Sequence, residues 1–285
     1  GSTRNGERFT KDWHLPNASA YAETCAAISL CMFAKRMSLI EPDGRYADAF
    51  ERALYNGVIS GISLDGRSFF YENPLEIDMY ARSCELMENS KKRYPITQRV
   101  EVFDCSCCPP NVTRFIASLG DCIYSYKENT VFIHQYLANN ACFDADGQAV
   151  KIQLETDYPV SGSVKIKVES FNGTLAVRIP AVCAEQNVKL NGTAFSGEPE
   201  KGYVYIPVTD GDVIQLELSV KPFLVTANSR VGDDAGRCAV MRGPVVYCLE
   251  ERDNVQLDAL SLRLPDQLRE TDGFSGMPDI IAGGV

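Results

Sequence analysis

Residues Asn111–Ala138 read NVTRFIASLGDCIYSYKENTVFIHQYLA, and the spacing of their apolar side chains changes near Asn129. Before that point the apolar side chains recur at intervals of three and four residues, as on one face of an α-helix. These side chains are Val112, Phe115, Ile116, Leu119 and Ile123. After that point the period shortens to two, which is typical of β-strands. The sequence therefore predicts an α half followed by a β half.

The α half contains three predicted helices. The first runs over Ser19–Ile40, is largely apolar and ends near Pro42, because proline disfavours helical geometry in the residue before it. The second carries an apolar stripe from Tyr46 to Val58. The third runs over Pro110–Tyr126. Residues 1–127 are therefore predicted to be helical.

The β half shows short alternating segments separated by turn signals. In SVKIKVES (163–170) valine and isoleucine alternate with lysine and glutamate. Asp-Gly and Asn-Gly pairs punctuate the segments, at 146–147, 172–173, 191–192 and 210–211. This rhythm predicts an antiparallel β-sandwich over 128–250. Residues 251–285 are expected to be an irregular tail or the start of a further β segment.

Composition excludes some classes of protein. With 38 acidic against 28 basic residues the formal net charge is −10, which disfavours a nucleic acid partner. No apolar run is long enough to cross a bilayer. An odd count of 11 cysteines in 285 residues favours a reduced, cytoplasmic protein over a disulfide scaffold. Because the chain begins with Gly1 and reads like a domain interior, we expect an N-terminal truncation, and a signal peptide cannot be assessed.

The stretch CSCCPPN (105–111) allows three interpretations. Cys105, Cys107 and Cys108 could be small buried apolar residues, although adjacent cysteines point in different directions. They could form a C-x-x-C redox pair, although that motif belongs to chains in which strands and helices alternate. They could also belong to a metal site just before a helix that starts at Pro110, where the helix N-terminus favours negative charge.

A second group of candidate ligands lies upstream in YAETCA (21–26). Glu23 and Cys25 face about 200° apart on a regular helix, so both could bind one ion only from a loop or an irregular first turn. If that condition holds, these two residues with Cys107 and Cys108 supply one oxygen and three sulfurs, a set suited to tetrahedral zinc. The spacing alone does not decide between this site and the alternatives.

Five motifs in order resemble glycoside hydrolase family 127 and its β-L-arabinofuranosidases. They are GERF (6–9), YAETCA (21–26), FFYENPLE (69–76), CSCCPPN with Arg114, and MRGPVVYCLE (241–250). They cover about 250 residues and both halves of the chain. The resemblance implies an α+β multidomain chain, in which the C-terminal part of an (α/α)6 barrel precedes the β-sandwich. About half of such a barrel would be missing upstream.

The resemblance also implies a reaction and a set of site residues. It implies a zinc-dependent retaining glycosidase with Cys107 as nucleophile and Glu7 as general acid/base. Glu23, Cys25, Cys107 and Cys108 match the Zn²⁺ ligands, and Tyr71 matches a substrate-site tyrosine. The implied partner is a plant cell-wall oligosaccharide or an arabinosylated glycopeptide, and a homodimer of the full-length protein is a further expectation.

Each assignment has a simpler alternative. Glu7 could pair with Arg4 or Arg8 on the surface, and Tyr71 could be a core aromatic residue. Trp13 lies in the polar stretch KDWHLPN and could line a sugar pocket or pack in the core. His14 and His134 are expected to be hydrogen-bonded residues. The whole chain could instead be a carbohydrate-binding or zinc-stabilised structural protein, or a family member that acts on another pectic sugar.

Overall fold

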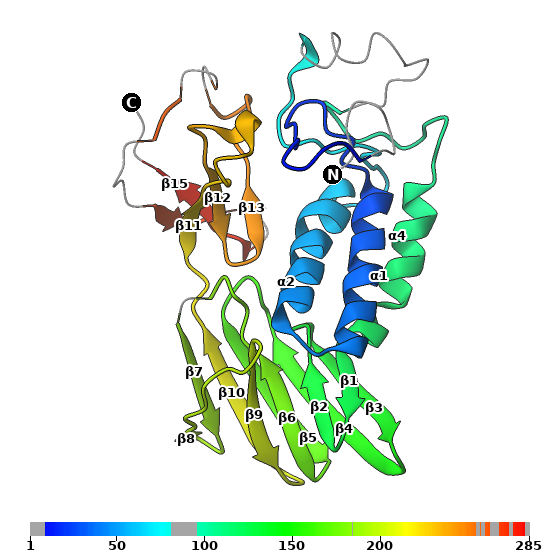
Figure 1. Cartoon of the computed structure of the whole chain (residues 1–285), viewed down its shortest axis with the longest axis vertical. Coiled ribbons are helices and arrows are strands. Elements are labelled where there is room, and N and C mark those ends of the chain that lie inside the picture. The colour runs from blue at the N-terminus through cyan, green and yellow to red at the C-terminus, as the bar shows by residue number, and fades with distance from the viewer. Residues whose placement is uncertain are drawn as a thin grey trace. The chain divides into compact units, whose positions relative to one another are not determined.

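The computed structural model describes residues 9–80, 96–183, 185–254, 257, 260–262, 268–273 and 276–282. It combines helices with four sheets (Figure 1). The chain divides into two compact units. The first, called here the helical unit, contains residues 1–36, 49–119 and 225–238. The second, called here the sheet unit, contains residues 37–48, 120–224 and 239–285.

The expected helices exist with corrected limits. They are α1 (Thr24–Ile40), α2 (Gly44–Ala53), the π-helical turn Leu54–Val58, the 3₁₀ turn Ile59–Gly61, α4 (Cys108–Ala117) and the 3₁₀ turn Leu119–Cys122. The first helix was predicted five residues too early. Residues ahead of α1 instead pair with the chain around Tyr71, whose carbonyl accepts the Thr24 N–H at 3.1 Å. The end of α1 ahead of Pro42 is confirmed.

The third helix was predicted to run to Tyr126, but it ends at Ala117. Ser118 leaves helical geometry with φ −102° and ψ 7°. Residues Tyr124–Lys127 form strand β1, which pairs with β2 (Thr130–Ile133) in antiparallel register. Glu128 and Asn129 both have positive φ, as a tight two-residue hairpin requires. The tertiary pairing therefore overrides the helical spacing of the apolar side chains.

The helices of the helical unit pack through aromatic and small residues. The Phe50 ring of α2 lies 5.9 Å from the Phe115 ring of α4, and the Cys31 thiol of α1 donates to the Phe50 carbonyl. Gly57 allows the π-helical turn to approach α1 closely, because a Cβ there would lie 2.6 Å from the Cβ of Ala27. These contacts join α1, α2 and α4 into one packed group.

The β-sandwich of the sheet unit consists of two sheets that share a core. One sheet has the order β1-β2-β6-β9 and the other β3-β4-β5-β10-β7-β8. The remaining strands are β3 (Asn139–Ala145), β4 (Gln148–Thr156), β5 (Ser163–Ser170), β6 (Gly173–Arg178), β7 (Gln186–Leu190), β8 (Thr193–Ala194), β9 (Tyr203–Val208) and β10 (Val213–Leu218). Alternate residues such as Val164, Ile166 and Val168 point into the core, as their spacing predicts.

The prediction that this sandwich is antiparallel needs one correction, because β2 and β6 pair in parallel. At Asn172-Gly173 the chain passes from β5 in one sheet to β6 in the other. This turn signal therefore marks a crossover between the two sheets, and it does not form a tight hairpin. Asp146-Gly147, by contrast, joins two paired strands with both residues at positive φ. The same dipeptide signal thus serves two different connections.

Two smaller sheets follow the sandwich. Strands β11 (Pro222–Val225), β12 (Ala239–Arg242) and β13 (Val245–Tyr247) form one, and β14 (Arg269–Thr271) with β15 (Asp279–Ile281) forms the other. The long connection from β11 to β12 belongs to the helical unit over residues 225–238. Within the described part of residues 251–285, β14 and β15 pair in antiparallel register.

Candidate metal centre and active site

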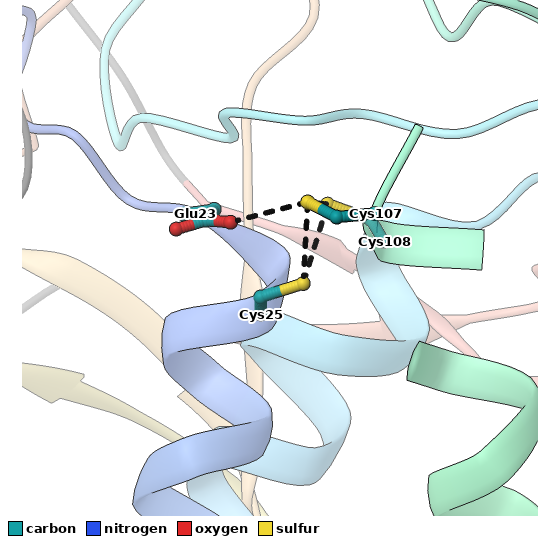
Figure 2. A group of neighbouring side chains, drawn as sticks. All are labelled: Glu23, Cys25, Cys107 and Cys108. Carbon is teal, nitrogen blue, oxygen red and sulfur yellow. Dashed lines mark hydrogen bonds between the residues drawn. The ribbon is translucent and has the colours of Figure 1, made fainter. Parts of the chain in front are cut away.

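Four side chains converge at the N-terminal ends of two helices (Figure 2). The Cys25 Sγ lies 3.7 Å from the Cys107 Sγ and 3.8 Å from the Cys108 Sγ, and the latter two sulfurs are 3.8 Å apart. The Cys107 thiol donates to the Glu23 Oε1 at 3.6 Å. One atom from each side chain lies within 4.8 Å of the others, so the group could hold a metal ion.

The geometric condition set by the spacing of Glu23 and Cys25 is met. Helix α1 begins at Thr24, so Glu23 precedes it while Cys25 stands in its first turn. Glu23 forms an antiparallel bridge with Glu72 instead of a helical turn. Because the two residues are not on one regular helix, their side chains converge instead of diverging.

The helix that follows Cys107 begins earlier than its predicted start at Pro110. Helix α4 begins at Cys108 and not at Pro110, and Cys107 already has helical geometry with φ −71° and ψ −30°. Two prolines in the first turn are tolerated because their missing N–H groups have no intrahelical partner there and their φ suits a helix. The two adjacent sulfurs therefore lie at the helix N-terminus, whose partial positive charge favours anionic ligands.

The thiols of Cys107 and Cys108 resist ionisation in the absence of a cation. Partial burial, together with the neighbouring Cys25 thiol, raises the pKa of Cys107 to about 12. Burial also raises the pKa of Cys108, which the charges of Cys25 and Cys107 raise further. Three thiolates beside a carboxylate repel one another, so a bound cation is the natural means of keeping them ionised.

The cluster has an aromatic wall. Tyr71 is buried and packs in one apolar cluster with Phe69 and Cys108, against which Cys25 and Cys105 also lie. The hydroxyl groups of Tyr71 and Tyr21 are 3.0 Å apart. Tyr71 therefore packs beside Cys108 of this cluster, and its role at a substrate site stays a prediction. Tyr21 was missed, although it is the first residue of the YAETCA motif.

The other predicted site residues are Trp13, which the structure describes, and Glu7, which lies outside the described residues. Trp13 is 42% exposed, and the Arg230 guanidinium lies 5.1 Å from the centre of its ring. Glu7 falls outside the residues that the structure describes, so its role stays a prediction. His14 accepts or donates a hydrogen bond with the Thr10 hydroxyl at 2.9 Å. None of the ten cysteines within the described residues forms a disulfide, including the three of CSCCPPN.

A buried polar network in the sheet unit joins His134 to residues that the sequence predictions did not connect with it. The Arg178 guanidinium donates to the Asp48 carboxylate and to the His134 carbonyl, both at 2.6 Å. The His134 ring lies 2.7 Å from both the Ser125 and the Tyr203 hydroxyl groups. Burial, with a smaller contribution from Arg178, lowers the pKa of His134 to about 4. His134 is thus a hydrogen-bonded residue, as expected.

None of the helices in the described part of the chain is both long and apolar enough to cross a bilayer.

Three family models match consecutive parts of the chain. The catalytic domain of glycoside hydrolase family 127 β-L-arabinofuranosidases matches residues 1–121. The middle domain of the same enzymes matches residues 130–220, and the C-terminal domain of the family matches residues 222–274. The cluster of Glu23, Cys25, Cys107 and Cys108 lies within the match to the catalytic domain.

Relatives of known activity show the same similarity. The chain is 38% identical over its whole length to a non-reducing end β-L-arabinofuranosidase of Bifidobacterium longum, of which it covers 44%. It superimposes with a TM-score of 0.86 on a family 127 β-L-arabinofuranosidase of Geobacillus stearothermophilus T6, at 42% identity over 95% of this chain and 43% of that one. A second solved family 127 β-arabinofuranosidase gives 0.85 at 36% identity, over 98% and 45% of the two chains.

The chain therefore spans less than half the length of these relatives, and it belongs to glycoside hydrolase family 127.

Proposed function

We propose that this chain carries the zinc site and the cysteine nucleophile of a retaining β-L-arabinofuranosidase that acts on plant-derived glycans. The observation that carries the proposal is the convergence of three sulfurs and one carboxylate from two segments more than 80 residues apart in sequence. Family membership supports the reaction class, because the relatives above are named for this activity.

The cluster fits zinc in particular. Tetrahedral zinc with zinc–sulfur bonds of about 2.3 Å places its sulfur ligands about 3.8 Å apart, and an oxygen ligand at about 2.0 Å lies roughly 3.5 Å from each sulfur. The sulfur–sulfur distances here are 3.7, 3.8 and 3.8 Å, and the carboxylate oxygen lies 3.6 Å from the Cys107 Sγ. Bound zinc would supply the positive charge that keeps the thiols ionised at neutral pH.

Cys107 is the best placed of the three sulfurs to act as nucleophile. Cys108 is fully buried and Cys25 is half-buried, whereas Cys107 is exposed. A sugar arriving from solvent therefore meets the Cys107 Sγ first. The two helix N-termini and the Tyr71 wall hold the sulfur in place, so little reorganisation is needed for attack.

The proposed reaction has two steps, each inverting the anomeric carbon. In the first, the Cys107 thiolate forms a bond to the anomeric carbon while the bond to the leaving oxygen breaks and Glu7 gives that oxygen a proton. In the second, water attacks the same carbon, Glu7 takes its proton, and the carbon–sulfur bond breaks to return the thiolate. Two inversions give net retention.

The helices fit a larger catalytic domain. Helix α1 exposes Leu30, Phe33, Leu39 and Ile40, which are apolar side chains of the kind that packs against further helices. We take α1, α2 and α4 to be the C-terminal part of the (α/α)6 barrel that the family resemblance implies. The activity of the intact protein and its dimerisation belong to this proposal.

The experiment that tests the function is hydrolysis of an aryl β-L-arabinofuranoside by the intact gene product that contains this chain. We expect turnover of the β anomer but not of the α anomer, and a loss of at least about 10³-fold in kcat for Cys107→Ala. Cys142→Ala is the matched control, because Cys142 is also an exposed free thiol but lies on β3 of the sheet unit. It should keep full activity.

Three other outcomes would contradict parts of the proposal. A zinc-loaded, folded protein without turnover would favour the alternative of a carbohydrate-binding or zinc-stabilised structural protein. Turnover of a different pectic sugar would keep the mechanism and change the substrate. Activity that survives in Cys107→Ala would remove the cysteine nucleophile.

A further inference from the structure

Thr24 lies between Glu23 and Cys25 in the sequence, and both of these neighbours belong to the cluster in Figure 2. Thr24 is fully buried, although threonine is mostly found at protein surfaces. The candidate ligands are less enclosed, because Glu23 and Cys25 are half-buried and Cys107 is exposed. A buried polar group needs a hydrogen-bond partner, so the bonds of Thr24 show what holds it there.

Two hydrogen bonds fasten Thr24 to one neighbouring segment. Its backbone N–H donates to the Tyr71 carbonyl at 3.1 Å, and its hydroxyl donates to the Phe70 carbonyl at 2.9 Å. The Asn73 N–H completes the same short antiparallel pairing by donating to the Ala22 carbonyl at 3.0 Å. Both donors of Thr24 are therefore bound to consecutive carbonyls of one segment, which fixes the orientation of the residue.

These bonds lie at the residue where helix α1 begins. The Glu23 carbonyl accepts an intrahelical bond from the Ala27 N–H at 3.2 Å, so Glu23 takes the capping position of the helix. The Glu23 carboxylate accepts the Cys107 thiol at 3.6 Å. Thr24 thus fixes the backbone at the step from extended pairing to helix, and Glu23 and Cys25 converge because that step falls between them.

Gly61 closes the space around the Thr24 hydroxyl. A Cβ at Gly61 would lie 2.6 Å from the Thr24 Oγ1 and 3.4 Å from its Cγ2, so an alanine there would displace the hydroxyl. The Gly61 carbonyl also accepts the Phe70 N–H at 2.7 Å, which holds the acceptor of that hydroxyl in place. The same segment contacts the other half of the cluster, because Cys108 and Tyr71 pack in one apolar group.

We propose that Thr24 is a positioning residue for the metal, because its two hydrogen bonds set the directions in which Glu23 and Cys25 meet one zinc ion. This inference rests on the proposed function and deepens it by naming a residue that acts on the ion through its two neighbours. Groups just outside the ligands of a metal site orient those ligands, and replacing them typically lowers metal affinity by roughly 10- to 100-fold. A role confined to folding would change the stability of α1 and leave the coordination geometry as it is.

The first test measures zinc binding by the intact gene product that contains this chain. Thr24→Val keeps the shape of the side chain and removes the hydroxyl donor, so the Kd for zinc, measured by competition with a chromophoric chelator, should rise about tenfold. Thr24→Ser keeps the donor and should keep most of the affinity. Thr113→Val is the matched control, because the Thr113 hydroxyl of α4 also donates to a carbonyl, that of Pro109 at 3.0 Å, but on an exposed face. It should leave the Kd unchanged.

A spectroscopic measurement separates positioning from stability. Cobalt(II) in the place of zinc absorbs visible light, with a band intensity that depends on how closely its ligands approach tetrahedral geometry. For Thr24→Val we expect these bands to weaken and shift while the protein stays folded. Gly61→Ala displaces the same hydroxyl from the other side and should change the bands in the same direction. Gly120→Ala is its control, because a Cβ there would meet no atom within 4 Å.

The outcomes separate this inference from the proposed function. A zinc Kd and a cobalt spectrum that stay at their wild-type values in folded Thr24→Val would overturn the positioning role alone. If Thr24→Val does not fold, wild-type values in Gly61→Ala would overturn it in the same way. A wild-type protein that binds zinc, responds to both substitutions and hydrolyses no arabinofuranoside would count against the proposed activity and leave the positioning role standing. A wild-type protein that binds neither zinc nor cobalt would overturn both.

Discussion

The Glu23, Cys25, Cys107 and Cys108 cluster and the Arg178 network are both polar groups brought together by distant segments, but they are satisfied in opposite ways. In the network each strong donor meets an acceptor of the protein: Arg178 binds Asp48 and the His134 carbonyl, and the His134 ring lies between two hydroxyl groups. In the cluster, three sulfurs and a carboxylate lie close together, and the pKa values of the Cys107 and Cys108 thiols are raised. A polar group that is complete by itself serves the fold, whereas one that lacks a counter-charge indicates a ligand.

The largest expected effect follows from removing the ligand of the cluster. If zinc is present at about 1,000 times its Kd, it stabilises the folded state by about 4 kcal/mol, and chelation should remove that amount. Hydrogen exchange measured by mass spectrometry should then show faster exchange in peptides from α1 and α4. Peptides from β5 and β10 in the sandwich should keep their protection. Cys25→Ser should reproduce this pattern without a chelator.

Hydrogen exchange after chelation can also contradict the contrast between the cluster and the Arg178 network. Chelation that leaves α1 and α4 fully protected would mean that the thiols are satisfied without a metal. The zinc content of the purified chain, measured by plasma mass spectrometry, should be close to one ion per chain for the wild type. It should stay there for Cys142→Ala, the exposed control thiol.

Breaking the Arg178 network should cost a comparable amount through a different mechanism. Arg178 is fully buried, and removing one partner of a buried ion pair typically costs about 3 to 5 kcal/mol because the other charge is left alone. Asp48 remains 16% exposed and accepts the Ala181 N–H, so we expect about 3 kcal/mol for Arg178→Met. Urea unfolding followed by tyrosine fluorescence would measure this loss.

A second substitution separates the contribution of the Arg178 charge from that of its packing. Because much of the loss is the cost of an unpaired carboxylate, adding Asp48→Leu to Arg178→Met should recover part of it. Lys165→Met is the control for an exposed pair. Lys165 lies 3.1 Å from Glu155 with both side chains about half exposed, and its loss should cost less than about 1 kcal/mol. No recovery in the double variant would mean that Arg178 contributes through packing instead of charge.

The parts of the structure that follow from local sequence were predictable. The alternation of Val164, Ile166 and Val168 places these residues in the core, and Asp146-Gly147 forms a hairpin. The spacing of Glu23 and Cys25 allows both to bind one ion only if they do not lie on one regular helix. Helix α1 begins at Thr24, between the two residues, and so meets that condition. Each of these signals lies within a few residues of the feature that it predicts.

The parts that depend on distant contacts were not predictable. Arg178 and Asp48 are 130 residues apart, and Asn17 and Asp234 are 217 apart. Such pairs leave no periodicity in a single sequence. The end of α4 was misplaced for the same reason, because Tyr124–Lys127 continue a helical spacing but gain more from pairing with β2. The stacking of Arg230 on Trp13 is a further contact of this kind.

The smallest expected effect, about 2 kcal/mol at pH 5, is a pH dependence of the network. Burial lowers the pKa of His134 to about 4, whereas an unfolded histidine titrates near 6.5. Above pH 6.5 both states are neutral and His134 contributes nothing to the pH dependence. As the pH falls from about 6.5 to about 4, the unfolded state binds a proton that the folded state refuses, so stability decreases by up to roughly 3 kcal/mol.

His134→Gln should flatten this part of the stability profile, because glutamine keeps hydrogen bonds to Ser125 and Tyr203 without titrating. Urea unfolding at pH 7, 6 and 5 would measure the slope. The chain has one other histidine, His14, so His14→Gln is the matched control and should leave the slope of the sheet unit unchanged. A slope that persists in His134→Gln would show that carboxylates, and not the buried imidazole, set the acid limit of the network. It would also mean that groups of the network other than His134 bind protons between pH 7 and pH 5.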